Sequence, residues 1–439
     1  MNTPSSDTPF GRDKSAAPSS LIPIPINGSF FRKLLAFSGP GYLVAVGYMD
    51  PGNWATDLAG GAQFGYALLF VILLSNIIAM ILQHLAVKLG IVTDRDLAHM
   101  CREYPKPLRI LLWLAAEVMI VACDLAEVIG SAIALQLLFH IPLVIGIVIT
   151  ALDVLLLLLL QNKGFRYLEA LIVTLIATIF ASFGIEVFLS RPEIAPLLAG
   201  FIPSASIITN PEMLFIALGI LGATVMPHNL FLHSSVVKTR DYTRDVRGKK
   251  EAIFFSTIDS TIALSLAFFV NAAILIVAAA TFHFSGHSEV SDINDAHRLL
   301  APLLGTSLAS ILFAVALLAS GQNSTLTGTM TGQIIMEGFL DLKIPAWLRR
   351  VITRLLAIVP AVLVAAYFGA AGTGKLLVLS QVILSMQLPF AVIPLVIFTS
   401  RKKYMGEFAN AGWLIATTSL IAIFLVALNG WLIWTSLFS

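Results

Sequence analysis

The sequence predicts an all-α polytopic membrane protein with eleven transmembrane helices. Of its 439 residues, 58% are hydrophobic and only 12% are charged, whereas soluble domains carry about 25% charged residues. A helical span needs about 20 apolar residues, and eleven segments satisfy this requirement. They lie near 34–60, 65–88, 108–138, 142–161, 168–190, 212–238, 252–282, 303–336, 348–369, 376–399 and 411–437.

Residues 1–29 differ from the rest of the chain because they are polar and rich in Ser and Pro. They contain no apolar stretch of the kind found in a signal peptide. We therefore expect a disordered cytoplasmic tail, followed by one transmembrane domain over residues 30–437.

Basic residues gather on one side of the predicted membrane. Of the 27 Lys and Arg residues, 24 lie in the tail or in the connections after spans 2, 4, 6, 8 and 10. Cytoplasmic loops carry such an excess, so we expect a cytoplasmic N-terminus and a C-terminus outside. These loops are better explained as topology signals than as a nucleic-acid surface, and we expect no nucleic-acid partner.

The first predicted span is interrupted near its middle by Asp50, Pro51, Gly52 and Asn53. A Pro-Gly break is tolerated in hydrocarbon only where the freed backbone groups face protein or a polar cavity. An ionisable residue within a span also indicates a functional site. The alternative is a structural kink with Asp50 reaching out from a helix end.

The sixth span is interrupted in the same way, by the segment from Gly222 to His228. Its Pro227 follows Pro51 by 176 residues, and the offset of five spans is odd, so the second unit is inverted in the membrane. Two discontinuous helices in matching positions are typical of inverted-repeat transporters. We expect repeats near 34–190 and 212–399, with an extra helix near 411–437.

The two breaks bring together groups suited to a metal cation. Asp50 offers a carboxylate, Asn53 an amide oxygen, and the backbone near Gly47 and Ala223 offers free carbonyls. Met226 adds a thioether, which Mg²⁺ and Ca²⁺ do not favour but softer first-row divalent ions and Cd²⁺ accept. The alternative for Met226 is a core residue that only fills space.

The third span contains three acids, Glu117, Asp124 and Glu127. Their spacing places them along one flank of a helix, and burying three charges in lipid is costly. They therefore resemble a proton relay, with His228 as a neighbour that can titrate near neutral pH. The alternative is a structural ion-pair network with three arginines, Arg240, Arg350 and Arg354.

Other polar positions carry weaker signals. Gln381 is notable because its span closes the second repeat, and His283 and His287 could capture metal in an outer loop. Cys101 and Cys123 are most simply small, unreactive fillers. No nucleotide-binding or nucleophile motif occurs in a suitable context, so we expect neither an enzyme nor a bound cofactor.

Three motifs carry a resemblance to a known family: Asp50 to Asn53, Met226 to Ser234, and Ser320 to Ser324. On these residues the chain resembles the Nramp family of proton-coupled divalent metal transporters, in particular its bacterial members. The resemblance implies the LeuT-type fold with eleven helices. It also implies uptake of Mn²⁺ and Fe²⁺ with protons across the bacterial inner (plasma) membrane, and the thioether of Met226 adds Cd²⁺ to the expected substrates.

The same resemblance implies roles for individual residues. Metal ligands are implied at Asp50, Asn53, Met226, Gln381 and the carbonyls of Ala223 and Gly47, and proton-pathway positions at Asp124, Glu127, His228 and Arg240. The expected partners are metal ions, protons and the lipid bilayer, with a monomer as a plausible state. Two alternatives remain, a sodium-coupled transporter of organic solutes with the same fold and a membrane metal sensor that does not transport.

Overall fold

The computed structural model describes residues 22–25, 28–150, 165–288, 290, 293–340 and 345–438, and most of these are helical. The first half contains α1 (Phe30–Phe37), α2 (Pro40–Gly47), α3 (Pro51–Phe64), α4 (Leu69–Thr93), α5 (Leu97–Met100), α6 (Lys106–Phe139), α7 (Leu143–Ile149), α9 (Phe165–Ser190), α10 (Ile194–Ala199) and α11 (Ser206–Thr209). The second half contains α12 (Pro211–Val225), α13 (Pro227–Val236), α14 (Val246–Thr281), α15 (Ile293–Leu304), α16 (Ser307–Leu340), α17 (Ala346–Ser400), α18 (Lys402–Met405) and α19 (Gly412–Phe438). Short 3-10 turns are η2 (Gly65–Leu68), η3 (Cys101–Glu103), η5 (Val237–Thr239), η6 (His283–Ser285) and η7 (Gly406–Phe408).

Both predicted interruptions are present. The first span is divided into α2 and α3, and the sixth into α12 and α13. Each of the four half-helices begins with a proline, Pro40, Pro51, Pro211 or Pro227. Proline suits the first turn of a helix, where its missing N–H costs nothing, but it cannot continue a preceding helix. The two mid-span prolines, Pro51 and Pro227, therefore stand directly at the breaks.

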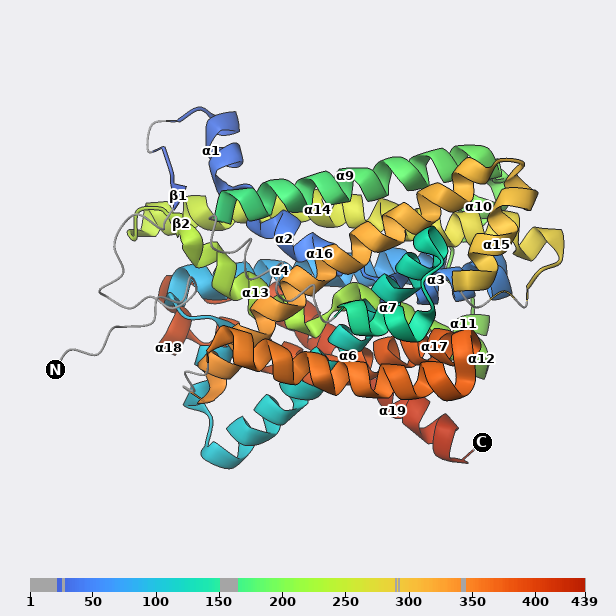
Figure 1. The fold of residues 1–439 in the computed structure, drawn as a ribbon. Helices are drawn as coiled ribbons and strands as arrows, with labels where there is room; N and C mark the ends of the chain where they lie inside the picture. Colours follow the sequence, from blue (N-terminus) through green and yellow to red (C-terminus); the bar gives the residue numbers. More distant parts are fainter. Residues whose placement is uncertain are drawn as a thin grey trace.

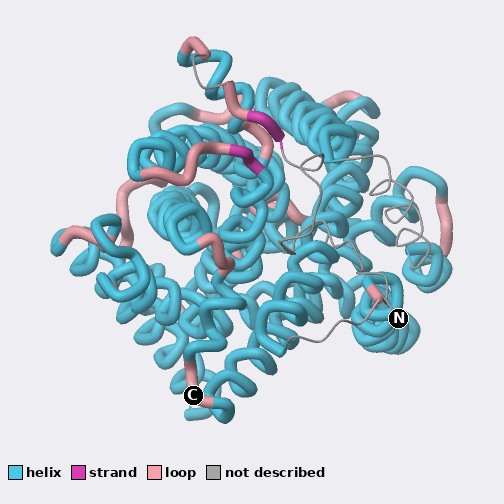
Figure 2. The backbone as a smooth tube through the Cα atoms, turned by 90° about the vertical axis from the view of Figure 1, so that its left-hand side faces the viewer, coloured by secondary structure: helices cyan, strands magenta, loops and turns pink. Residues whose placement is uncertain are grey.

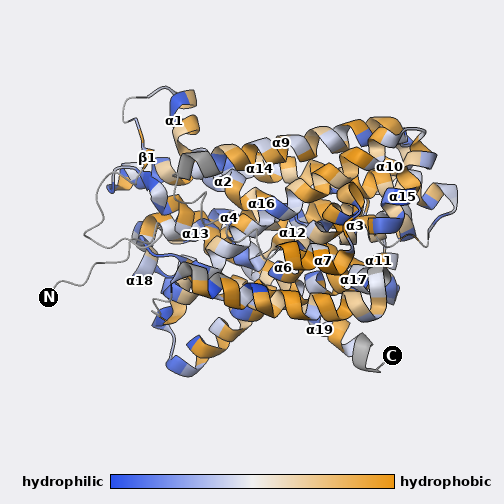
Figure 3. Cartoon of the chain, in the orientation of Figure 1, coloured by the Kyte–Doolittle hydropathy of each residue, from blue (hydrophilic) through white to orange (hydrophobic). Residues whose placement is uncertain are grey.

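The long helices run roughly along one common direction (Figure 1) and appear end-on when the molecule is turned by 90° (Figure 2). Hydrophobic residues dominate their middle parts, and hydrophilic residues gather toward the two ends (Figure 3). Nine segments of the described chain are long and apolar enough to cross a membrane. The protein is thus a multi-pass membrane protein.

These nine segments are not a direct test of the predicted eleven. The segment Pro51–Thr93 joins part of the first span to the second, and most of the fourth predicted span lies outside the described residues. The ninth and tenth spans form one helix in α17, which is interrupted at Gly369 by a positive φ of 62°. The count of eleven therefore stays a prediction.

A two-residue parallel strand pair joins distant parts of the chain at one end of the bundle. β1 (Ile22–Pro23) pairs with β2 (Arg240–Asp241), with Ile22 opposite Arg240. β1 lies within the tail that the sequence predicted to be disordered. Order in the described chain therefore begins before residue 29.

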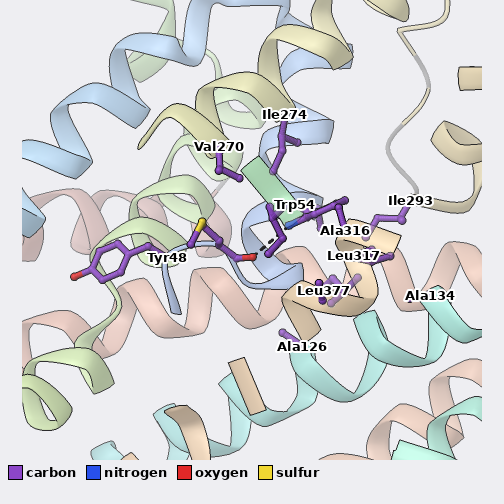
Figure 4. Packing of buried hydrophobic residues seen from close by; sticks show 14 of the residues in the cluster. Tyr48, Trp54, Ala126, Ala134, Val270, Ile274, Ile293, Ala316, Leu317 and Leu377 are labelled. Atoms are coloured by element: carbon purple, nitrogen blue, oxygen red, sulfur yellow. Dashed lines mark hydrogen bonds between the residues drawn. The ribbon is translucent and has the colours of Figure 1, made fainter. Parts of the chain in front are cut away.

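Trp54 anchors the core beside the first break (Figure 4). It is fully buried, and its ring packs edge-on against Phe183 and Phe313. Its Nε1 donates to the Met49 carbonyl at 3.3 Å, and Ser320 Oγ donates to the same carbonyl at 2.5 Å. A carbonyl freed by the break is thus satisfied by side chains, as it must be in a water-free interior.

Candidate functional site

Asp50 is the N-cap residue of α3 and is fully buried. Its Oδ1 accepts hydrogen bonds from the backbone N–H and from Nδ2 of Asn53, each at 2.8 Å. Its Oδ2 has no hydrogen-bond partner among the described residues. One side of this carboxylate is therefore satisfied by the helix, and the other is available to a cation or proton.

Asn53 Nδ2 donates hydrogen bonds to three oxygens of the predicted metal site. Besides Asp50 Oδ1, its Nδ2 donates to the Ala223 carbonyl at 3.2 Å and the Gly47 carbonyl at 3.5 Å. These carbonyls belong to the last turns of α12 and α2, where helix carbonyls lack intrahelical partners and carry partial negative charge. The structure thus brings together Asp50, Asn53, Ala223 and Gly47.

Met226 and Gln381 lie at the same junction. Met226 is fully buried and is the single residue between α12 and α13, with φ of 2° and ψ of 103°. Gln381 of α17 lies against both breaks, because a Cβ added to Gly52 would collide with its side chain and one added to Gly222 would collide with its carbonyl. Its Oε1 has no partner in the described part of the chain.

Two asparagines support this junction. Asn271 Nδ2 donates to the Tyr48 carbonyl at 2.8 Å and to Asn53 Oδ1 at 3.3 Å. Asn229 Nδ2 donates to the Val44 carbonyl at 3.3 Å. The sequence analysis singled out neither asparagine for this junction, although both are polar residues within predicted spans.

A chain of contacts leads from the second break to the acids of α6. The Cys123 thiol donates to Glu127 Oε1 at 3.3 Å, and its Sγ lies 3.8 Å from His228 Nε2. All three side chains are buried. Cys123, interpreted from the sequence as a filler, therefore lies between two predicted proton-pathway residues.

The predicted ion-pair network is present in part. Asp124 pairs with Arg354 of α17, whose Nη1 also lies 4.0 Å from Glu127 Oε2. Glu117 pairs at 3.0 Å with Arg349, which the sequence interpretation did not single out. The side chain of Arg350 lies outside the described residues. The acids of the predicted relay are thus the same ones that form ion pairs.

The alternative interpretation of the third span pairs its acids with Arg240, which the resemblance places on the proton pathway. Its described partners lie elsewhere: it binds Glu169 of α9 at 2.7 Å and the Ser38 carbonyl at 2.6 Å. Nearby, Asp259 of α14 accepts from the Gly41 N–H at 2.7 Å. These contacts place Arg240 at the start of α2, where it secures the chain ahead of the first break.

Sequence reasoning overlooked four further buried acids, Asp57, Glu169, Glu186 and Asp259. Each lies within a predicted span, and that position was a usable signal.

Two histidines make contacts that hold the fold together: His233 bonds Gln83 Oε1 at 2.9 Å, and His283 bonds the Ala62 carbonyl at 3.0 Å. His283 thus ties an outer turn to the end of α3.

The solved structures similar to this chain include transporters of two degrees of likeness. A crystal structure of the Eremococcus coleocola manganese transporter matches with a TM-score of 0.86 and 45% identity, covering 93% of this chain and 88% of that one. Mhp1, a nucleobase-cation-symport-1 family transporter, matches with a TM-score of 0.61 and 16% identity, covering 96% of each chain. The second likeness concerns the fold alone, and together they confirm the LeuT-type fold.

Comparisons of the sequence with known proteins also find membrane transporters. The chain is 61% identical over 417 residues to the divalent metal cation transporter MntH of a Nostoc species, covering 95% of this chain and 94% of that protein. It is 60% identical over 435 residues to the MntH of Mesorhizobium japonicum, covering 98% and 96%. The model of the natural resistance-associated macrophage protein-like family, Nramp, matches residues 41–435. This chain therefore belongs to the Nramp family of membrane transporters and is not an enzyme.

Proposed function

We propose that this chain imports divalent transition-metal cations, chiefly Mn²⁺ and Fe²⁺ and also Cd²⁺, together with protons. The observation that carries the proposal is the convergence of Asp50 Oδ1 and the carbonyls of Ala223 and Gly47 on a single atom, Asn53 Nδ2. Three oxygens that surround one donor form the cradle that a small cation needs.

Substrate binding in this cradle requires a change at Asn53. Half a turn of the amide would replace its NH₂ by Oδ1, so that oxygens alone face the cation. The displaced NH₂ would then face Asn271 Nδ2, which is also a donor. Asn271 would therefore have to turn as well and present its own Oδ1, which has no partner among the described residues, as the acceptor. Met226 and Gln381 would complete the ligand set, the former with a sulfur that favours softer ions.

The proposed proton route runs from Asp50 and His228 to the acids of α6. The contacts of Cys123 with Glu127 and His228 support this route, and Arg354 supplies positive charge beside Asp124 and Glu127. Glu117 and its partner Arg349 lie further along the same two helices. Arg240 acts at a distance from this route, through Glu169 and the start of α2.

The proposed direction of transport follows from the distribution of charge. The basic connections lie at the end of the bundle that carries β1, β2 and α18 (Figure 1), and basic loops favour the cytoplasmic side. We therefore place this end and the N-terminus in the cytoplasm of a bacterial cell, with the C-terminus outside the inner membrane.

The test is uptake of radiolabelled Mn²⁺ into proteoliposomes, with and without an inward proton gradient and with a pH-sensitive dye inside. We expect uptake to accelerate with the gradient and the interior to acidify when Mn²⁺ is added. Uptake driven by Na⁺ with no internal acidification would favour sodium coupling instead. Mn²⁺ binding without uptake under any gradient would favour a sensor.

A further inference from the structure

A wholly apolar groove lies between α17 and α19, away from the breaks. It has a volume of about 420 Å³ and exposes no polar surface. Ile393, Val396 and Ile397 line it from α17, and residues between Ser419 and Ala427 line it from α19.

The groove follows from the side chains on the two facing helices. The α17 residues are spaced by three and four positions, so they form one face of that helix. On α19 the small residues Ser419, Ala422 and Ala427 leave space that larger side chains would fill. The nine residues from Ser419 to Ala427 span a rise of about 12 Å along the helix, which gives an elongated slot.

Polar contacts tie α17 to α19, or to the segment just before α19, on both sides of this slot. At one end, Asn410 Nδ2 donates to Thr399 Oγ1 at 2.9 Å. At the other, Asn429 Nδ2 donates to the Ser385 carbonyl at 3.1 Å. These two contacts hold the facing segments together at both ends of the groove.

Three cations follow the end of α17 directly: Arg401, Lys402 and Lys403. Arg401 comes one helical turn after Ile397, the last α17 residue of the groove. All three are exposed, and none has an ion-pair partner within the described chain. The one acid in the following turn is Glu407. α18, which holds the two lysines, lies at the basic end of the bundle (Figures 1 and 3).

We propose that this groove binds an acyl chain of an anionic phospholipid, whose phosphate contacts Arg401, Lys402 and Lys403. The slot complements a hydrocarbon chain in shape and polarity, and basic clusters at the end of membrane helices attract acidic headgroups. Trp413 at the start of α19 is 71% exposed, as befits a residue at the membrane–water interface. A second copy of this chain would fill the slot but leave the cations without an anion.

This proposal is independent of the transported substrate. The test uses native mass spectrometry of the full chain in detergent, with phosphatidylglycerol and phosphatidylcholine of identical acyl chains as probes. We expect phosphatidylglycerol to bind about tenfold more tightly, since each cation near a membrane surface contributes measurably to such binding. The combined substitutions Arg401→Gln, Lys402→Gln and Lys403→Gln should abolish this preference.

A second variant tests the groove itself. Ala427 is exposed and lines the slot, so Ala427→Phe should lower the affinity for phosphatidylglycerol about tenfold by filling it. Ala416→Phe is the matched control, because Ala416 is an exposed residue of α19 that does not line the slot. If the triple variant does not fold, Arg401→Gln alone should lower the preference about threefold.

Three results would overturn the proposal. The first is equal binding of the two lipids to the unaltered chain. The second is a preference for phosphatidylglycerol that survives the charge substitutions. The third is a dimer that forms in place of lipid binding and is lost on Ala427→Phe, because the groove would then be an interface between copies.

Discussion

Asp50 and Asp96 have the same local role in two different surroundings. Each is the N-cap of a helix and each accepts from the N–H three residues later, Asn53 at 2.8 Å and His99 at 3.0 Å. Both are buried, with 0% and 1% exposure. They differ in the second carboxylate oxygen, because Asp96 Oδ2 accepts from Lys238 at 2.9 Å, whereas Asp50 Oδ2 has no partner in the described part of the chain.

The difference explains why one aspartate is structural and the other is proposed to be functional. Burial alone would raise the pKa of Asp96, but the positive charge of Lys238 and the hydrogen bond from His99 hold that pKa below its usual range. A buried carboxylate needs such a partner. Asp96 has the ammonium of Lys238 beside its cap, whereas at Asp50 we propose that the transported cation takes the corresponding place.

The largest expected effect is at Asp50. Asp50→Asn keeps a capping side chain for α3 but removes the formal charge at the breaks, so Mn²⁺ uptake into proteoliposomes should fall at least about 100-fold, equivalent to about 2.7 kcal/mol. Asp96→Asn is the matched control and should transport at a rate close to that of the unaltered chain. Wild-type uptake by Asp50→Asn would refute the proposed site.

A smaller effect is expected at the acids that have an arginine beside them. Asp124→Asn and Glu127→Gln should leave Mn²⁺ affinity within about threefold, because neither touches the cradle, but should lower metal-driven proton entry at least about tenfold. Internal pH in dye-loaded vesicles is the readout, and Glu212→Gln, an exposed acid at the start of α12, is the control. Unchanged proton entry in both variants would leave these acids with only their structural ion pairs.

Selectivity should change at Met226. Met226→Ala removes the sulfur, so Cd²⁺ uptake should suffer most, while Ca²⁺ and Mg²⁺ should compete about tenfold better against labelled Mn²⁺, a change of about 1.4 kcal/mol. Met213→Ala alters a buried methionine of α12 away from the break and should leave competition unchanged. If both variants compete alike, site size or dehydration sets selectivity.

Asp96→Asn is expected to change transport least. It should nevertheless lower the stability of the fold. Because the pKa of Asp96 is lowered in the folded state, its contribution is complete above the unfolded pKa of about 3.9 and disappears as pH falls below that value. Asp96→Asn should therefore lower the free energy of unfolding by about 2 kcal/mol between pH 5 and 8. The difference in stability between the unaltered chain and the variant should shrink below about pH 4. Thermal unfolding of both proteins, followed by tryptophan fluorescence at each pH, measures this difference in stability.

Much of the architecture could be predicted from the sequence because the bilayer permits few solutions. Long apolar runs must be helices, and prolines within two of them, Pro51 and Pro227, marked the breaks. The break within α17 falls at Gly369, the end of the ninth predicted span. The fourth span and the total of eleven helices remain predictions.

The pairing of individual side chains could not be predicted in the same way. Arg349, Arg350 and Arg354 are all basic residues near the start of one helix, and only packing decides which of them meets Glu117 or Asp124. Similarly, nothing local indicates that Arg240 meets Glu169 of α9. Helical spacing gives the face of one helix, but the partner depends on how two helices rotate and slide against each other.

The strand pair between β1 and β2 has a practical consequence for work with this chain. Ile22 and Pro23 are held by backbone contacts to the segment after α13, close to the point where Arg240 binds the Ser38 carbonyl ahead of α2. A version shortened to residue 30 would remove the first of these links and keep the second. Affinity tags and fluorescent fusions should accordingly be attached ahead of residue 22, where the pair can still form.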